Sequence, residues 1–462
     1  MRNKFKLKQK GKIIGLVALL ILFNLFLLPG NVLAQDSQYQ FTEEVKKEEL
    51  SNGITVLVRE NQAIDIVSLA TVSNIGSKND PEEKAGISYL TQKMLLEGTD
   101  NRSSREIDMD IESLGINLSP NTSHEYSQLT LKTTTDNFSE GLDIYFDLWK
   151  NSTFPQNNLD TEKNHAREQI ESRKDEPVNE AVYNFLELYY EDHPFGKPVP
   201  GSKKGHENIE PQDLKTWFNQ IYNPEELVIS VVGNIDEEEL ISTLEEKIGD
   251  WSPEQTEDPE LEPKKPEFEP PQEAKTETVE RFTDASWLIM GYGAPSALDE
   301  DSAALSVLNS VLGVGMSSRL FRNVRGKQGL AYSVGSSYES FYGPSVFITY
   351  VGTRLAQMDK AKSEIIKEME RFTEEQVSES ELEKAREYMK GQFLIGNESS
   401  MNQAVSMGVF ETTERGYNWL DKYPEIIDDV NPEEIQKVAT EYFQGPLIES
   451  KVLEKSNDLP GF

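Results

Sequence analysis

The sequence predicts an α+β fold built from two duplicated domains, each a mainly antiparallel sheet with helices packed on one face. Strand-like runs are mixed with pairs of amphipathic helices, as in this class of fold. The same order of elements occurs twice along the 462 residues. In particular, PQDLKTWFNQIYNPEELVISVVG at 211–233 parallels PEEIQKVATEYFQGPLIESKVL at 432–453. We therefore expect two domains of about 200 residues with one plan.

Residues 1–34 have the pattern of a secretory signal peptide. Six basic residues precede an apolar run, Ile13–Leu28, which Pro29 interrupts, and Val32-Leu33-Ala34 resembles a cleavage site. The run is shorter than the roughly 20 apolar residues that span a bilayer. Cleavage after Ala34 is thus favoured over an uncleaved amino-terminal anchor. We expect an exported chain (extracellular, periplasmic or in the cell envelope) that is not held in a membrane after cleavage.

The composition excludes several classes of protein. The chain has no cysteine, which rules out disulfides, a cysteine-attached lipid, thiol catalysis and cysteine-ligated metal. Its formal net charge is −35, and removal of the leader leaves 40 basic against 81 acidic residues, a net charge of −41. So acidic a surface argues against nucleic acid and anionic membranes as partners. Without disulfides, an exported chain depends on its core or on bound partners for stability.

The first domain is predicted to span residues 40–251. Asp80-Pro81 indicates the start of its first helix, and Ser103 with Glu106 forms the capping-box pattern at the second. Strands are expected at Ile54–Arg59, Ile66–Ser73, Ile116–Pro120, Tyr126–Thr133 and Leu227–Val232. Helices are expected at Ala85–Leu96, Ser103–Leu114, Asn137–Lys150, Leu159–Asp175, Asn179–Glu191 and Pro211–Tyr222.

A proline-rich segment separates this domain from a second one. Residues 252–275 carry six prolines among charged residues, a composition typical of an extended linker. The second domain is predicted to span residues 276–453. Its strands are expected at Thr276–Arg281, Trp287–Tyr292 and Val346–Val351, and its helices at Asp299–Leu312, Gln357–Phe372, Glu379–Leu394, Met401–Glu414, Asp421–Asp428 and Pro432–Tyr442.

Ser317–Glu339 is the most informative run in the chain. Apolar residues at helical spacing end at Gly329, and an alternating, strand-like run follows, so a helix leads into a strand. Arg325 and Tyr332 flank the turn and could project toward one cleft. An arginine offers five donors to peptide carbonyls or carboxylates, and a tyrosine hydroxyl can donate to a developing oxyanion. From spacing alone, a surface arginine beside a half-buried tyrosine is the alternative.

Several blocks of sequence, spread over residues 45–450, point to one family. They are GISYLTQKMLLEGTDNRSSREIDMDIESLGINLSPNTSHEY at 86–126, FPQNNLDTEKNHAREQIESRKDEP at 154–177, HPFGKPVPGS at 193–202, the Asn223–Gly233 segment and SSRLFRNVRGKQGLAYSVGSSYES at 317–340. In this order they resemble the insulinase/pitrilysin metallopeptidase family, which includes the mitochondrial processing peptidases. The resemblance implies that the linker joins the two domains into a clamshell.

The zinc site of that family is the inverted motif H-x-x-E-H on a helix. Two histidines one helical turn apart bind zinc, the glutamate between them activates a water, and a glutamate from a later helix completes the ligand set. Counted back from Gly98-Thr99, the histidine positions here hold Tyr89 and Lys93, and the general-base position holds Gln92. The third ligand aligns with Gln169, or with Glu168 after a slip of one residue.

None of these replacements fits a zinc site. Glutamine cannot take a proton from water, a protonated lysine repels a divalent cation, and a tyrosine with a pKa near 10 is a poor ligand at neutral pH. The four histidines are scattered, and His165 alone lies near the site. We therefore expect no metal and no cofactor. The alternative role for Tyr89, Gln92 and Lys93 is packing, with hydrogen bonds among the three.

The resemblance assigns a different role to the second domain. In active members an arginine and a tyrosine seven residues apart grip the substrate and polarise the scissile carbonyl, and Arg325 and Tyr332 match that spacing within the same motif. Substrate capture in the family resembles the addition of a peptide strand to a sheet edge in the first domain. Here Ser119-Pro120 lies on that edge, and proline has no N–H to offer, so the edge is a poor template.

Three hypotheses follow. The first is an exported, non-catalytic subunit that binds extended, unfolded peptide and supplies Arg325 and Tyr332 to a zinc-bearing homologue in a heterodimer, since such two-domain members often work as pairs. The second is a peptide-binding or scaffold protein with no peptidase role. The third is a self-sufficient zinc peptidase with a rearranged site. Independent peptidase activity is not expected.

Overall fold

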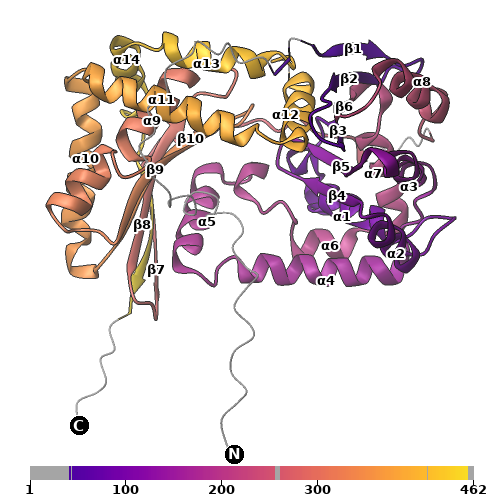
Figure 1. Cartoon of the computed structure of the whole chain (residues 1–462). Coiled ribbons are helices and arrows are strands. Elements are labelled where there is room, and N and C mark those ends of the chain that lie inside the picture. Colours follow the sequence, from indigo (N-terminus) through magenta and orange to yellow (C-terminus); the bar gives the residue numbers. More distant parts are fainter. Residues whose placement is uncertain (1–40, 43, 255–260, 414, 456–462) are drawn as a thin grey trace, which may run out of the picture. The chain divides into compact units, whose positions relative to one another are not determined.

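The computed structural model describes residues 41–42, 44–254, 261–413 and 415–455 (Figure 1). The predicted signal peptide, residues 1–34, lies outside the described residues. Contacts group residues 39–462 as one compact unit. Within the described part, no helix combines the length and the apolar character that crossing a membrane requires.

Each half of the described chain contributes one sheet. The first is six-stranded in the order β1-β2-β6-β3-β5-β4, and the second is five-stranded in the order β7-β11-β8-β10-β9. The strands of the first are β1 (Lys46–Glu49), β2 (Thr55–Glu60), β3 (Ile66–Ser73), β4 (Asn117–Thr122), β5 (Ser127–Thr134) and β6 (Leu227–Gly233). Those of the second are β7 (Lys275–Arg281), β8 (Ser286–Ala294), β9 (Ser333–Glu339), β10 (Ser345–Thr353) and β11 (Ile448–Glu454).

The two sheets share one topology once β1 is set aside. In each, the first strand runs parallel to the last, as β2 does to β6 and β7 to β11. All other neighbouring strands are antiparallel. The predicted duplication and the mainly antiparallel α+β class are therefore confirmed. By this correspondence, β4 at the edge of the first sheet is equivalent to β9 at the edge of the second.

The helices follow the same duplicated plan. In the first half they are α1 (Ile87–Met94), α2 (Ser104–Leu114), α3 (Phe138–Asn151), α4 (Gln156–Ser172), α5 (Pro177–Tyr190), α6 (Lys203–Asn208), α7 (Pro211–Ile221) and α8 (Glu237–Ile248). In the second half they are α9 (Ser302–Gly313), the π-helix η9 (Phe321–Lys327), α10 (Met358–Glu374), α11 (Glu379–Gly396), α12 (Ser400–Thr412), α13 (Trp419–Asp429) and α14 (Pro432–Tyr442).

One face of each sheet packs against helices of its own half. Alternate residues of the first sheet, such as Leu69 and Val231, join a buried core with residues of α1, α3 and α7. Leu288 and Phe347 of the second sheet do the same with residues of α9, α10 and α14. The prediction of helices on one face of each sheet is confirmed, and the other face of each sheet is also buried.

The second face of each sheet is covered by a helix from the other half. Ala404 and Met407 of α12 pack with Val72 and Val228 of the first sheet, and residues of α5, such as Phe185, pack with Ile289 of the second. In Figure 1, α12 lies beside β3 and β6 accordingly. In the duplicated plan α5 and α12 occupy equivalent positions, so the exchange is reciprocal. Burial on both faces explains why the central strands read as continuous apolar runs such as LVISVVG.

The described part of the linker is bound to the body of the protein rather than free. Leu261 joins the first core, and Phe268 packs with the aromatic side chains of α5. Asn79 Nδ2 donates to Lys264 O at 2.9 Å, and Lys264 N donates to Asn79 O at 3.2 Å. The predicted linker, residues 252–275, includes residues 255–260, which lie outside the described part.

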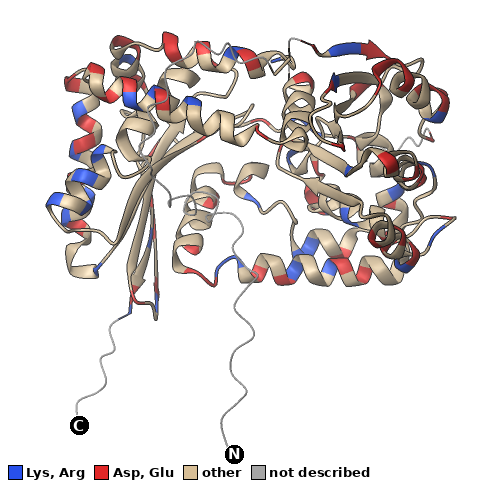
Figure 2. Ribbon diagram, in the orientation of Figure 1, with Lys and Arg blue, Asp and Glu red and all other residues tan. Residues whose placement is uncertain are grey.

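Charged residues lie mainly on the helices and connections, and the strands β8 and β10 of the second sheet carry none (Figure 2). This distribution follows from the burial of both sheet faces, because an unpaired charge is costly to bury. The acidic excess is therefore carried by the outer surfaces of the helices.

The sequence-based boundaries need three corrections. The helix predicted from Asp80-Pro81 begins at Ile87, because Gly86 adopts a positive φ of 104° that interrupts the helical backbone. The helix before Gly329 is a π-helix. The elements β1, α6, α8 and β11 were not among the predicted helices and strands. The strand β1 is exposed, and α6 spans only six residues.

Candidate functional site

The segment that carries Arg325 is fixed to the second half by a buried arginine. Arg319, 4% exposed, donates from Nε and Nη2 to the two carboxylate oxygens of Glu381, both at 3.0 Å. Its guanidinium also lies 4.2 Å from the centroid of the Phe372 ring. A bidentate pair of this kind restricts orientation as well as position. It therefore holds the start of η9 in place against α10 and α11.

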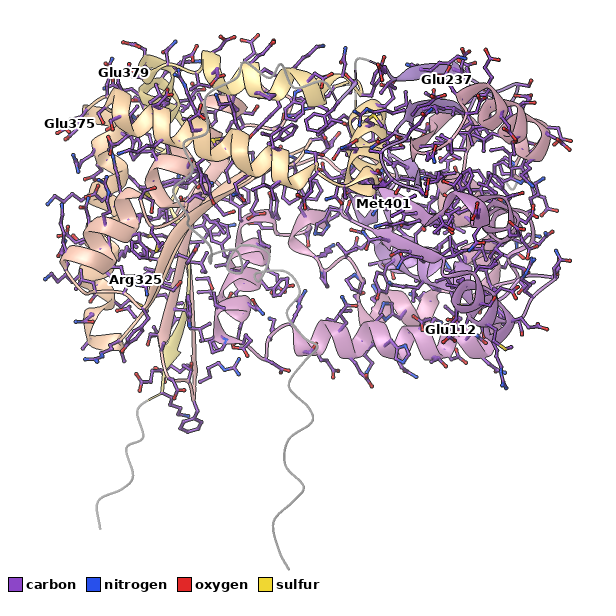
Figure 3. The ribbon with its side chains drawn as sticks, in the orientation of Figure 1. Glu112, Glu237, Arg325, Glu375, Glu379 and Met401 are labelled. Carbon is purple, nitrogen blue, oxygen red and sulfur yellow. The ribbon has the colours of Figure 1, made fainter. Side chains whose placement is uncertain are left out.

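Arg325 projects to the surface from η9 (Figure 3). Its guanidinium lies 4.9 Å from the centroid of the Phe321 ring, one turn earlier on the same helix. Gly329, at a φ of +62°, then reverses the chain, a backbone conformation that favours glycine. Among the described residues no carboxylate pairs with Arg325, so its donors are available to a ligand.

Tyr332 follows the turn and is also at the surface. Its side chain is 53% exposed, and its amide donates to Gly352 O at 2.8 Å, which continues the pairing of β9 with β10. Its hydroxyl accepts a hydrogen bond from Arg354 Nε at 2.8 Å. No hydrogen bond joins Arg325 to Tyr332 in the described part of the chain. The structure places both side chains in solvent, and their role in substrate binding stays a prediction.

In the first half, the positions of the family's zinc ligands hold side chains that bond to other residues of the protein. Tyr89 Oη donates to Gln169 Oε1 at 2.9 Å. This contact supports the alignment of Gln169, rather than Glu168, with the third ligand. Burial, together with the nearby charge of Glu162, raises the pKa of Tyr89. The phenol therefore stays protonated at neutral pH, which makes it a poor metal ligand.

The general-base position is occupied by a structural side chain. Gln92 is 1% exposed, and its Nε2 donates to the Tyr222 hydroxyl at 3.2 Å. Lys93 Nζ lies 5.5 Å from the centroid of the Tyr89 ring. The prediction that Tyr89, Gln92 and Lys93 hydrogen-bond among themselves is wrong, because Tyr89 and Gln92 bond to residues of other elements. The contacts of Tyr89, Gln92 and Lys93 do agree with the predicted packing role of these three residues.

These donors do not fit zinc. A protonated phenol, a neutral amide and an ammonium group offer no anionic ligand, and Lys93 would repel the cation. Across the described residues, no three or more His, Asp or Glu side chains gather in a group that could hold a metal ion. His165 is exposed and contacts Glu162 Oε1 at 3.0 Å through Nδ1.

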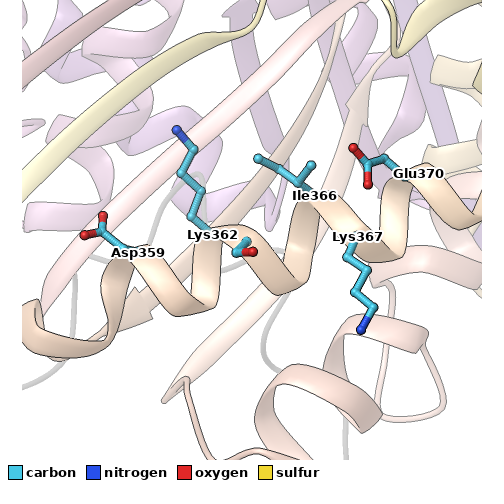
Figure 4. Close-up of a pocket in the computed structure, with 6 residues that line it drawn as sticks. Asp359, Lys362, Ile366, Lys367 and Glu370 are labelled. Carbon is cyan, nitrogen blue, oxygen red and sulfur yellow. The ribbon is translucent and has the colours of Figure 1, made fainter.

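A surface hollow on the second half lies elsewhere and contains no group of catalytic side chains. It measures about 460 Å³ along α10 and is lined by Asp359, Lys362, Ser363, Ile366, Lys367 and Glu370 (Figure 4). Lys362 is already paired with Glu449 of β11. Because one helix supplies all of its lining, this hollow is a shallow surface feature rather than an active-site cleft.

One residue of the site was missed by the sequence reasoning. Arg354 lies beyond the Ser317–Glu339 motif and has no spacing signal of its own. The antiparallel pairing of β9 and β10, in which Ser333 opposes Gly352, brings it beside Tyr332. Only a correct strand pairing could have identified it.

A duplicated α+β fold with a zinc position filled by Tyr89, Gln92 and Lys93 defines a peptidase-like protein of the inactive type. Residues 55–202 match the model of the insulinase family (peptidase family M16), and residues 208–389 match that of the peptidase M16 inactive domain. The chain belongs to the insulinase, or M16, peptidase family.

Relatives and solved structures agree with this assignment. The chain is 28% identical over 400 residues to the uncharacterized zinc protease YmxG of Bacillus subtilis, covering 86% of this chain and 96% of the relative. It resembles the crystal structure of a protease from Helicobacter pylori (TM-score 0.79, 20% identity, 88% of this chain and 99% of that one). A structure described as the peptidase M16 inactive domain from Pseudomonas fluorescens gives a TM-score of 0.79 at 20% identity, with coverage of 89% and 98%.

Proposed function

We propose that this chain is an exported, non-catalytic subunit of a heteromeric zinc peptidase. It binds unfolded peptide and supplies Arg325 and Tyr332 to a homologue that carries an intact H-x-x-E-H motif. The observation that supports this proposal is a contrast between the two halves. The zinc position is occupied by side chains bonded to other elements, whereas Arg325 and Tyr332 are exposed.

The chemistry of the pair suits peptide binding. The Arg325 guanidinium has donors without a carboxylate partner in the described part of the chain, and these can bond to peptide carbonyls. The Tyr332 hydroxyl can donate to the oxygen of the scissile carbonyl as negative charge develops on it. The metal and the general base belong to the partner. This chain contributes binding and polarisation only.

The edge of the first sheet agrees with a non-catalytic role for that half. β4 lies at the edge of the sheet with β5 as its only neighbour among the described strands, and Pro120 lies within it. An incoming peptide strand would find no N–H at Pro120. We propose that productive peptide binding takes place on the partner's first domain.

The test is to co-express the chain with such a homologue and to assay peptide cleavage. We expect Arg325→Ala and Tyr332→Phe each to lower turnover by about 10²-fold, comparable to the loss of an oxyanion donor. Gel filtration should show that the complex stays intact. Lys327→Ala, on the same helix, is the matched control and should leave turnover unchanged.

The mass of the chain recovered outside the cytoplasm tests export and cleavage after Ala34.

Unchanged turnover in both variants would remove the role proposed for the pair. Zinc at unit stoichiometry in the chain purified alone, with cleavage activity, would favour a self-sufficient enzyme. Peptide binding without any rise in the homologue's activity would favour a scaffold or peptide-binding protein.

A further inference from the structure

Strand pairing places a second arginine against the Tyr332 side chain. Ser333 opposes Gly352 in the antiparallel β9–β10 pair, and Tyr332 N donates to Gly352 O at 2.8 Å. The same register puts Thr353, the last residue of β10, opposite Tyr332, and Arg354 is the next residue along the chain. The result is the 2.8 Å hydrogen bond from Arg354 Nε to the Tyr332 hydroxyl.

The chemistry of this bond fixes the direction of the tyrosine proton. A guanidinium has donors only, so the phenol oxygen must be the acceptor. The proton of the hydroxyl remains available, and in the described chain it has no acceptor. A hydroxyl oxygen that accepts a charge-assisted bond is also polarised, which strengthens its own O–H as a donor. Arg354 therefore turns a freely rotating hydroxyl into a directed donor.

Arg354 is free of competing partners in the part of the chain that the structure describes. Its side chain is exposed, and no carboxylate pairs with it although the chain has 81 acidic residues. By contrast, Arg319 and Arg322 nearby both bond to Glu381. The Arg354 guanidinium is thus committed to the tyrosine.

We propose that Arg354 is a positioning residue that orients the Tyr332 hydroxyl to donate to a carbonyl of an extended peptide. The proposal rests on the function proposed above for Tyr332. It adds a residue outside the Ser317–Glu339 motif and assigns it an action through Tyr332 rather than on the peptide directly.

The first test observes the tyrosine without any peptide. The full chain is labelled with ¹³C at the ζ carbon of tyrosine, and the signal of Tyr332 is identified as the one that Tyr332→Phe removes. We expect Arg354→Ala to shift this signal alone. Arg354→Lys, which keeps a cationic donor, should return it toward the wild-type position. A signal indifferent to both substitutions would overturn the inference, because the hydrogen bond would then be absent in solution.

The second test measures the affinity of the full chain for a short, unstructured, fluorescein-labelled basic peptide by anisotropy. We expect Arg354→Ala to weaken binding by roughly five-fold, the effect of one hydrogen bond. In the Tyr332→Phe background the same substitution should have no further effect, because coupled residues are not additive. Arg105→Ala, which removes an exposed arginine from α2, is the charge-matched control.

The outcomes separate the two proposals. Equal losses from Arg354→Ala with and without the Tyr332 hydroxyl would overturn the inference, since Arg354 would then act on the peptide by charge. Binding that is unaffected by Arg325→Ala and by Tyr332→Phe would overturn the proposed function, and the inference with it.

Discussion

Gln92 illustrates how a family's catalytic position becomes structural. Its amide bonds to Tyr222 from α1 to the end of α7, inside the first core. The absence of an acidic group at this position could be predicted from the sequence. The new partner could not, because Tyr222 is 130 residues away and only the packed helices bring the two together. The same holds for Arg354 and Tyr332, which meet through strand pairing.

Glu381 is the residue on which the position of η9 depends most directly. Burial alone would raise the pKa of Glu381, but the hydrogen bonds and charge of Arg319, with the bonds from Ser378, outweigh it and lower the pKa to about 2. The stabilising contribution of this carboxylate is therefore present above its ordinary pKa of 4.5. It is lost as the pH falls from there toward 2.

We expect Glu381→Gln to lower the free energy of unfolding by roughly 2 kcal/mol at neutral pH, because it leaves the buried Arg319 charge without a carboxylate. The loss should shrink as the pH falls below 4.5. Urea unfolding at several pH values measures both effects. Glu379→Gln, which changes an exposed carboxylate two residues earlier on α11, is the control. A loss that does not change between neutral and acidic pH would contradict the linkage.

At the scale of elements, α12 shows how closely the exchanged helices approach the sheets. A Cβ atom at Gly408 would lie 2.7 Å from Val72 Cγ2 and 3.3 Å from Val72 Cβ. Such a distance requires the Val72 side chain, the strand or the helix to shift. The amphipathic pattern predicted α12 as a helix correctly. It did not predict which sheet the helix covers, because periodicity identifies an apolar face and not its partner.

We expect Gly408→Ala to destabilise the protein by roughly 1–2 kcal/mol despite the higher helix propensity of alanine, because overpacking outweighs it. Gly391→Ala on α11 is the matched control, since a Cβ there meets open space. It should be stabilising by roughly 0.5–1 kcal/mol. Thermal unfolding of the two variants should therefore show changes of opposite sign. A stabilising Gly408→Ala would mean that α12 is not seated on β3 as described.

At the scale of the whole molecule, the exchange of α5 and α12 joins the two halves into one folding unit. The duplication could be predicted from the sequence because the order of elements and one pair of segments repeat. The exchange could not be predicted, because each helix belongs in sequence to one half and covers the sheet of the other. A half on its own would expose one apolar sheet face, which includes Val72 and Val228 in the first sheet and Ile289 and Ile448 in the second.

We expect the fragments 39–254 and 261–462 each to be unfolded or aggregated when expressed alone, because each lacks the helix that covers its sheet. Mixed during refolding, they should form a one-to-one complex. The intact chain should give a single calorimetric transition. Far-UV and near-UV circular dichroism of each fragment provide the measurement. A fragment that unfolds cooperatively by itself would contradict the requirement for the other half.

The reciprocal placement of α5 and α12 also bears on how such a chain could arise. A single copy of the domain would have one helix without a sheet to pack on and one sheet face that no helix covers. Two separate copies could each cover the bare sheet face of the other, and a covalent connection between them would keep this arrangement. The present molecule has the architecture of a symmetric pair joined by a covalent tether, in which each copy completes the core of the other.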